Sequence, residues 1–200
     1  MPNTPHRSPV ESVRPMGSDS DPIITADLAL ADLSPVLKVG VKGPMAATWL
    51  SKQERVVLDE IYQIHGEAGG TQIVRTGSEE FVIVFSGPDS AGQWHQSLES
   101  APSGVYGFEH EGAVFELSGR RAVEVFAQTC AIDFSGTPAR RIIFTRVAGT
   151  TCAIIPDPVE GMPQYRLWVD YASAPYLWEQ LAQITRDCGG QLVTRRAMNS

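Results

Sequence analysis

The sequence lacks any long apolar run. No stretch of its 200 residues approaches the ~20 apolar residues that a helix needs to span a bilayer. The N-terminus also lacks the apolar core of a secretory signal peptide. From these two absences we expect a cytoplasmic protein without a membrane anchor.

Cysteine is scarce, with three in the whole chain: Cys130, Cys152 and Cys188. Their spacings are wide, and no C-x-x-C motif or Cys/His cluster is present, so the sequence predicts neither a zinc nor an iron–sulfur site. An odd number of cysteines does not suggest a disulfide framework, and reduced thiols fit a cytoplasmic location.

Motifs for nucleotides and nucleophiles are missing too. No G-x-G-x-x-G follows a predicted strand, the glycine cluster at 66–70 lacks that spacing, and there is no P-loop and no G-x-S-x-G. His65, His95 and His110 stand singly, and a lone histidine is more often a surface or core residue than a catalyst. We therefore predict no catalytic, cofactor-binding or metal-binding residue in this chain.

Positive charge is in deficit, with 16 basic against 23 acidic side chains and a net charge of -7. This balance excludes a general nucleic-acid binder and a polybasic membrane-surface protein. Lysine is absent after residue 100, where all 9 basic residues are arginine. Arginine suits bidentate pairing with carboxylates at protein interfaces, although ordinary solvated arginines explain the same bias.

What is present begins with a polar segment. Residues 1–22 are rich in Pro, Ser and charge and do not predict a packed core, so they are either disordered or laid across a partner. Residues 23–33 fit a strand or a short helix equally well. We assign 1–33 to an N-terminal, partner-contacting segment and 34–200 to a single two-lobed domain.

Apolar alternation and turn residues predict a mixture of strands and helices in that domain. Strands are predicted at 36–43, 56–64, 71–75, 80–86, 105–108, 113–117, 140–147, 151–155, 164–169 and 192–195. Helices are predicted after Pro44, from Pro88, at 120–129 and at 175–186. The fold class is α+β.

One pattern occurs twice at a constant offset of 76 residues, as Val39-Gly-Val41-Lys-Gly43-Pro-Met-Ala46 and Phe115-Glu-Leu117-Ser-Gly119-Arg-Arg-Ala122. Each copy reads as a strand, a glycine turn that excludes bulky residues, and a helix that a small alanine lets lie close to the sheet. The sequence therefore predicts two pseudo-symmetric strand–helix lobes, at about 34–100 and 104–196.

This repeated pattern resembles the folate-binding domain of the glycine-cleavage T-protein family. The second half is specifically similar to the γ subunit of heterotetrameric sarcosine oxidase, and Arg7-Ser-Pro9 resembles the start of that subunit. The similar stretches are 113–122, 130–134, 146–155, 165–172 and 176–181. The resemblance covers most of residues 34–187.

The resemblance implies an accessory subunit with no cofactor of its own. The implied complex, a sarcosine oxidase, contains α, β, γ and δ subunits, and γ packs mainly against α. This complex demethylates sarcosine oxidatively to glycine with oxygen, and tetrahydrofolate accepts the one-carbon unit. FAD, FMN, NAD, zinc and tetrahydrofolate are expected in the partner subunits. The alternative is a stand-alone folate-binding or one-carbon transfer module of the T-protein type, although the family's C-terminal barrel has no counterpart here.

Four side chains are candidate partner contacts: Arg140, Arg146, Arg166 and Trp168. The arginines, with Arg141, are able to gather on one sheet face, where they form a carboxylate site, pair with an acidic partner, or remain solvated. Trp168 alternates out of phase with its apolar strand neighbours, and an exposed Trp often anchors an interface.

Asp170 also has two interpretations. It follows a predicted strand, where a carboxylate is able to bind a ligand amine or a pterin. It also precedes a predicted helix, where capping is the commoner use of aspartate.

Overall fold

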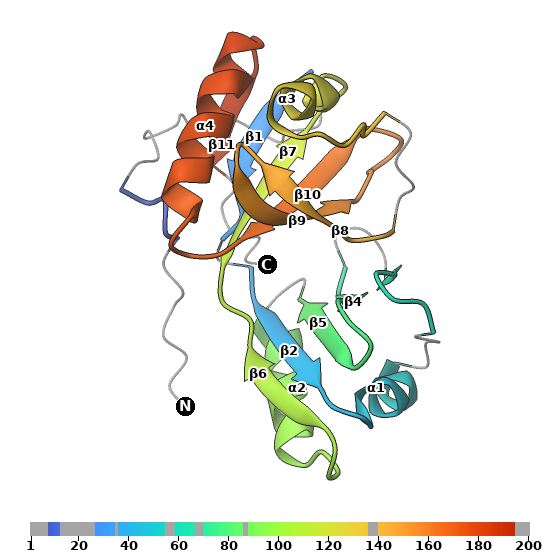
Figure 1. Cartoon of the computed structure of the whole chain (residues 1–200). Coiled ribbons are helices and arrows are strands. Elements are labelled where there is room, and N and C mark those ends of the chain that lie inside the picture. The colour runs from blue at the N-terminus through green and yellow to red at the C-terminus, as the bar shows by residue number, and fades with distance from the viewer. Residues whose placement is uncertain are drawn as a thin grey trace. The chain divides into compact units, whose positions relative to one another are not determined.

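A computed structural model describes residues 8–12, 27–34, 36–54, 59–66, 70–85, 88–135 and 140–194. The chain divides into two compact units (Figure 1). Unit 1 comprises Met1–Pro35, Gly112–Ala139 and Ile143–Ser200, and unit 2 comprises Val36–Glu111 and Arg140–Ile142. Each unit has its own sheet, helices and core, so the α+β class is confirmed.

Unit 2 contains a five-stranded sheet in the order β3-β4-β5-β2-β6, with every neighbouring pair antiparallel. The strands are β2 (Lys38–Lys42), β3 (Ile64–His65), β4 (Gln72–Arg75), β5 (Glu80–Val84) and β6 (Tyr106–Glu109), and the helices are α1 (Ala46–Glu54) and α2 (Pro88–Glu99).

The core of unit 2 lies between one face of this sheet and the two helices. Val39 and Val41 alternate toward the helices with Phe81 and Ile83 of the neighbouring strand. Trp49 of α1 meets Trp94 of α2 edge to face, with ring centroids 5.7 Å apart, so both tryptophans are core residues.

Unit 1 contains a six-stranded sheet in the order β11-β1-β7-β10-β9-β8. Its neighbouring strands are antiparallel, except for the parallel pair β1/β11. The strands are β1 (Ala29–Asp32), β7 (Ala113–Ser118), β8 (Ile143–Val147), β9 (Thr150–Pro156), β10 (Gln164–Val169) and β11 (Gln191–Thr194). The helices are α3 (Ala122–Thr129) and α4 (Ala174–Asp187).

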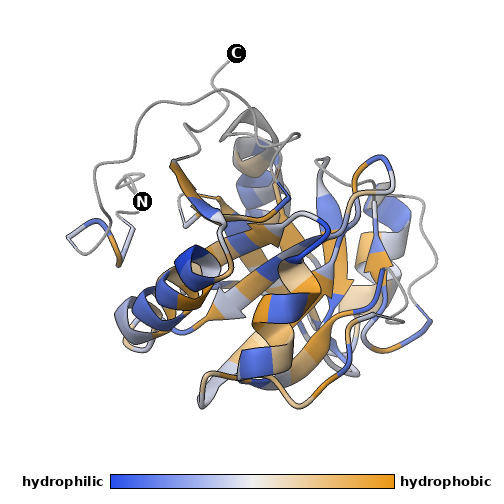
Figure 2. Cartoon of the chain, turned by 90° about the horizontal axis from the view of Figure 1, so that it is seen from above, coloured by the Kyte–Doolittle hydropathy of each residue, from blue (hydrophilic) through white to orange (hydrophobic). Residues whose placement is uncertain are grey.

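Helices α3 and α4 supply the apolar side chains that cover one face of the unit 1 sheet. Phe115 of β7 packs against Trp178 of α4 with ring centroids 5.2 Å apart. Phe126 of α3 lies 5.0 Å from the Tyr165 ring of β10, edge to face. Figure 2 shows the result in each unit: the strands are mostly hydrophobic, and the helices carry their hydrophilic residues on their outer sides.

The repeat read from the sequence builds two matching turns. Gly43 and Gly119 have φ angles of 119° and 105°, and a side chain at either would overlap the carbonyl oxygen of Gly104 or Asp27. Two residues later, Met45 N–H and Arg121 N–H donate to those same carbonyl oxygens, at 3.0 and 3.1 Å. The glycines are therefore required for the close approach of another chain segment at the start of each helix.

The two sheets also repeat one strand order. Unit 2 has β3-β4-β5-β2-β6, and unit 1 has β8-β9-β10-β7-β1 with β11 added beyond β1. In this correspondence β1 precedes β2 in sequence but pairs with β7, whereas β6 precedes β7 but pairs with β2. Each sheet is thus completed by a strand that comes just before the corresponding central strand of the other unit, β1 before β2 and β6 before β7.

This exchange corrects the predicted boundaries. Residue 33 does not separate a tail from the domain, because β1 is an interior strand of the unit 1 sheet and is buried throughout. The half predicted at 104–196 begins before β6, which belongs to the unit 2 sheet. Both differences arise from long-range strand pairing, which a short apolar run does not reveal.

Two further predictions differ locally. Of the strand predicted at 56–64, residues 56–58 lie outside the described residues, 59–62 form no strand, and only Ile64–His65 is assigned to β3. Of the polar segment 1–22, only 8–12 are described, and Val10 there is fully buried in the core of unit 1. None of the helices in the described ranges has both the length and the apolarity to cross a membrane.

Candidate functional site

The second face of the unit 1 sheet, away from α3 and α4, carries a buried polar cluster. Every residue of β7 and β10 is buried, which means that both faces of these strands are shielded from water. Phe115 and Leu167 point to the helices, so their neighbours Glu116 and Arg166 occupy the other face. We call Glu116, Asp157, Gln164 and Arg166 the Arg166 cluster.

Strand register brings the cluster together. Arg166 on β10 stands opposite Glu116 on β7, with 3.9 Å between its Nε and the Glu116 Oε2. Its Nη2 lies 3.2 Å from Oδ2 of Asp157, which follows β9. Gln164 Nε2 donates to Glu116 Oε2 at 2.5 Å. The guanidinium therefore faces two carboxylates inside the chain, an arrangement that compensates its burial.

This geometry changes the interpretation of two candidate partner contacts. Arg166 is 9% exposed and Trp168 is 5% exposed, so the exposed anchor that the sequence suggested is absent. Trp168 does lie on the face opposite to Leu167, as its alternation predicted, but β10 is buried on both faces. Because Arg166 already pairs with Glu116 and Asp157, it is not an open site for a ligand carboxylate.

The other candidate arginines are exposed and stabilise local turns. Arg146 on β8 donates through Nε and Nη2 to the carbonyl of Gly149, at 3.1 and 2.5 Å, across the β8–β9 turn. Arg140 donates through Nη2 to the carbonyl of Gly66 at 2.6 Å. Arg140 belongs to unit 2 whereas Arg146 and Arg166 belong to unit 1, and each has its own local partners. Partner contact at Arg140 and Arg146 stays a prediction.

Asp170 closes the turn that leads into α4. Its Oδ1 accepts the Ser173 N–H at 3.0 Å, and its carbonyl oxygen accepts the Ala174 N–H at 3.1 Å. The hydrogen bond from Ser173 lowers the pKa of this exposed carboxyl. The carboxylate therefore stabilises the turn that precedes α4, whose N-cap residue is Ser173 and has no side-chain cap hydrogen bond.

The sequence analysis missed a basic pair on the second face of the unit 2 sheet. Lys38 begins β2, and His110 directly follows Glu109, which pairs with Val39. Burial lowers the pKa of Lys38 to about 8. Burial and the nearby Lys38 charge lower the pKa of His110 to about 4. A lysine beginning an alternating strand is typical of a solvated face, so nothing in the local pattern distinguished this one.

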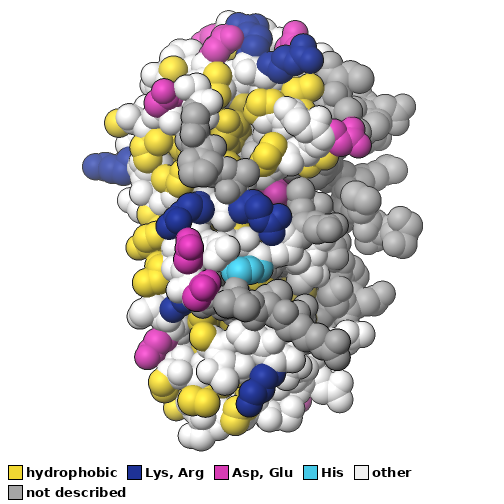
Figure 3. Space-filling model, turned by 90° about the vertical axis from the view of Figure 1, so that its right-hand side faces the viewer, with side chains coloured by type: hydrophobic (Ala, Val, Ile, Leu, Met, Phe, Trp, Pro, Cys, Tyr) yellow, Lys and Arg dark blue, Asp and Glu magenta, His cyan; other side chains and the backbone are white. Residues whose placement is uncertain are grey.

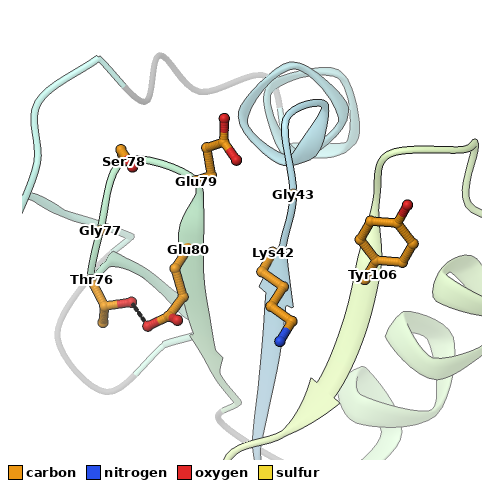
Figure 4. A pocket seen from close by; sticks show the side chains of 8 residues that line it. All are labelled: Lys42, Gly43, Thr76, Gly77, Ser78, Glu79, Glu80 and Tyr106. Atoms are coloured by element: carbon orange, nitrogen blue, oxygen red, sulfur yellow. Dashed lines mark hydrogen bonds between the residues drawn. The ribbon is translucent and has the colours of Figure 1, made fainter.

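A shallow hollow in unit 2 is lined by polar side chains (Figure 4). A row across the strands sets Glu80, Lys42 and Tyr106 side by side, and Thr76 Oγ1 donates to Glu80 Oε1 at 2.8 Å. The hollow is wide open to solvent, so its carboxylate and ammonium groups remain hydrated. It offers no water-excluded position for a reacting group.

Charges of both signs are interspersed with hydrophobic side chains on the face drawn in Figure 3, without a field of one sign. The ranges that the structure describes contain no group of three or more His, Cys, Asp or Glu side chains able to hold a metal ion. The pKa of His65 is lowered by burial and by Arg140, and His95 is exposed. These histidines do not form a site together with an acidic residue.

Comparison with known proteins gives a fold but no sequence family. No family model matches the chain, and no curated protein matches it significantly. Among solved structures, the glycine cleavage system aminomethyltransferase T from Bartonella henselae is similar with a TM-score of 0.66 and 18% identity, over 84% of this chain and 48% of that one. The chain thus spans about half the length of that protein.

A second similar structure is a chain of the heterotetrameric sarcosine oxidase from Corynebacterium sp. U-96 in complex with pyrrole 2-carboxylate. The TM-score is 0.68 and the identity 17%, over 91% of this chain and 95% of that one. The two chains are therefore of nearly equal length. The chain shares its fold with about half of the aminomethyltransferase T and with nearly all of this sarcosine oxidase chain.

Proposed function

We propose that this chain is an accessory, γ-like subunit of a multisubunit sarcosine oxidase. The chemistry resides in partner subunits of the α, β and δ kind, which hold FAD, FMN, NAD, zinc and tetrahydrofolate, and the main contact is with α. The assembly is cytoplasmic. The chain itself contributes a folded body of two pseudo-symmetric lobes and no reacting group.

One observation carries the proposal: the share of each similar protein's length that this chain matches. The sarcosine oxidase chain matches over 95% of its length, whereas the aminomethyltransferase matches over 48%. The chain therefore resembles nearly the whole of the sarcosine oxidase chain and about half of the aminomethyltransferase. The chemistry of the described residues supports the same proposal, because the Arg166 cluster is internally paired and the hollow around Lys42 is open to water.

The second candidate is a stand-alone folate-binding or one-carbon transfer module. The fold shared with an aminomethyltransferase favours it. The half-buried pair Lys38 and His110 would then be the first place to look for an anionic ligand, since a binding site often perturbs the pKa of its residues.

Co-purification distinguishes between the two candidate functions. The chain is expressed alone and together with candidate α, β and δ subunits, and size-exclusion profiles, flavin absorbance and sarcosine-dependent peroxide formation are compared. We expect a colourless, inactive protein alone and co-elution with a yellow, active complex. A chain that stays apart from those subunits and binds tetrahydrofolate in calorimetry would replace the subunit function with the second candidate.

Charge reversal tests the two exposed arginines within the complex. Arg140→Glu and Arg146→Glu are expected to weaken co-elution if these residues contact an acidic partner. Arg120→Glu is the matched control, because Arg120 is also exposed and was not a candidate contact. Equal co-elution of all three variants would remove Arg140 and Arg146 from the interface.

A further inference from the structure

The described piece of the N-terminal segment lays one side chain into the core of unit 1. Val10 is fully buried and belongs to the core between the sheet and helices α3 and α4. Its N–H donates to Ser8 Oγ at 3.2 Å, and Glu11 N–H donates to the Ser8 carbonyl at 3.3 Å, so 8–11 form a tight turn. Glu11 and Ser12 are exposed. The turn thus presents Val10 inward and its polar side outward.

A buried carboxylate holds the other end of this turn. Ser8 Oγ donates to Oδ2 of Asp32 at 2.5 Å, and Asp32 is 1% exposed. Asp32 ends β1, and its Oδ1 accepts both the N–H and the Oγ–H of Ser34, at 2.9 and 2.5 Å. Ser34 therefore orients the carboxylate through Oδ1, and Oδ2 accepts the hydrogen bond from Ser8. A hydrogen bond from a hydroxyl to a buried carboxylate is among the stronger kinds.

Chain connectivity does not force the segment into this place. The Ser8–Asp32 contact spans 24 residues, and residues 13–22 of the connection contain Pro15, Gly17 and Pro22 and no predicted element. Closing a loop of this length has an entropic cost, which the contacts of Ser8 and Val10 must outweigh.

We propose that unit 1 contains a peptide-binding pocket whose occupant is the chain's own N-terminal segment. The pocket recognises a Ser-x-hydrophobic pair: the Asp32 carboxylate accepts the serine hydroxyl, and the apolar core accepts the side chain two residues later. The segment docks within its own chain and is released and rebound as a unit.

Tethering sets the affinity that a free peptide must show. A short linker holds a ligand at an effective concentration of about 1 mM. A segment docked about ten times more often than released then corresponds to a free peptide that binds with a Kd of about 0.1 mM. Docking also buries the Val10 side chain next to the exposed Glu11, so a protease that must bind both residues cleaves only the released form, in proportion to its population.

Proteolysis of the full-length chain is the first test. Cleavage after Glu11 by a glutamate-specific protease is followed by mass spectrometry, and each variant is normalised to a free peptide of its own residues 1–20. We expect wild type to be cleaved at least about ten-fold more slowly than its peptide. Val10→Ser is expected to approach the peptide rate, and Ser8→Ala to lie between. Ser12→Ala, at an exposed position, is expected to match wild type.

Peptide binding is the second test. A chain lacking residues 1–12 is titrated with a fluorescent peptide of residues 1–14, and anisotropy is expected to report a Kd near 0.1 mM that Val10→Ser in the peptide weakens at least ten-fold. Absence of binding to a folded truncated chain overturns the proposal. If the truncated chain does not fold, proteolysis decides: a wild-type rate equal to that of the free peptide overturns it equally.

Discussion

At the scale of single residues, the buried charges carry the largest energetic consequences. The Arg166 guanidinium is paired with Glu116 and Asp157 in a part of the sheet that water hardly reaches. A buried ion pair adds little net stability compared with an apolar replacement of the whole group, but removing one partner leaves the others uncompensated. The cluster is thus sensitive to single substitutions while contributing no chemistry of its own.

Arg166→Ala is expected to lower the free energy of unfolding by roughly 3–5 kcal/mol, because Glu116 and Asp157 lose their common counter-ion. Urea unfolding followed by circular dichroism measures the change. Arg146→Ala is the control, since its exposed side chain contacts one carbonyl, and its expected effect is below about 1 kcal/mol. Equal losses in the two variants would show that the cluster is not energetically distinct.

His110 predicts a dependence of stability on pH. Its folded pKa of about 4 lies below the ordinary 6.5, so the unfolded chain binds more protons between these values. The contribution of His110 is therefore complete above pH 6.5 and is lost as the pH falls toward 4. The full effect is up to about 3 kcal/mol at 1.36 kcal/mol per pKa unit.

Urea unfolding of wild type and His110→Asn at pH 7, 5.5 and 4.5 tests this dependence. We expect wild type to lose more stability than the variant as the pH falls, since carboxylate protonation affects both chains alike. Parallel curves for the two proteins would mean that His110 titrates normally in the folded state.

At the scale of elements, the two glycine turns determine how each helix begins. Gly43 and Gly119 share a positive φ and the same close approach to a carbonyl oxygen, which then accepts the N–H two residues later. Each turn connects a central strand to its helix while a second segment passes close by. This local requirement explains why the pattern recurs at a fixed offset.

Gly43→Ala and Gly119→Ala are each expected to destabilise the protein by more than about 2 kcal/mol, since backbone strain and steric overlap act together. Gly149→Ala is the matched control, with a φ of 81° but no atom within 4 Å of the added methyl group. Its expected loss is about 1 kcal/mol, from strain alone. Thermal unfolding of the three variants compares the two contributions. A control as damaging as the other two would refute the role of the close approach.

The sequence predicted most elements and these turns because their signals are local. Alternation in β2 and β7, the glycines at 43 and 119, and the amphipathic face of α4 are each visible within a few residues. The burial of Arg166 and Trp168 was not visible, because β10 alternates like a strand with one face in water, whereas a strand shielded on both faces is usually a continuous apolar run. The choice of candidate partner contacts depended on whether β10 has a face in water. The proximity of Lys38 to His110 was overlooked because it too depends on long-range strand pairing.

At the scale of the whole molecule, the chain passes repeatedly between the two units. Unit 2 is formed by Val36–Glu111 together with Arg140–Ile142, and the remaining segments form unit 1. Within unit 2, Ile64 N–H donates to the Arg140 carbonyl and Ile142 N–H to the Tyr62 carbonyl, at 2.9 and 2.8 Å. Neither unit is a continuous stretch of sequence, and neither is removable by a single cut.

Truncation distinguishes the polar segment from the strand that follows it. A chain lacking residues 1–26 keeps β1 and is expected to fold with a lowered Tm, because it loses Val10 from the core. A chain lacking residues 1–33 loses an interior strand and is expected not to fold. Near-ultraviolet circular dichroism and thermal melting report the difference. A cooperative melt of the shorter chain would contradict the role assigned to β1.

Because β1 and β6 are exchanged between the sheets, the strands of the unit 2 sheet are all synthesised before those of the unit 1 sheet, except for β1. When the ribosome has made residue 142, every strand of the unit 2 sheet exists, whereas β1 still awaits most of its own sheet. Its antiparallel partner, β7, begins 81 residues after β1 ends, which is on the order of 10 s at ~5–20 residues per second. During that interval β1, an interior strand of the finished sheet, has no partner strand to pair with, and its apolar residues are accessible to a chaperone.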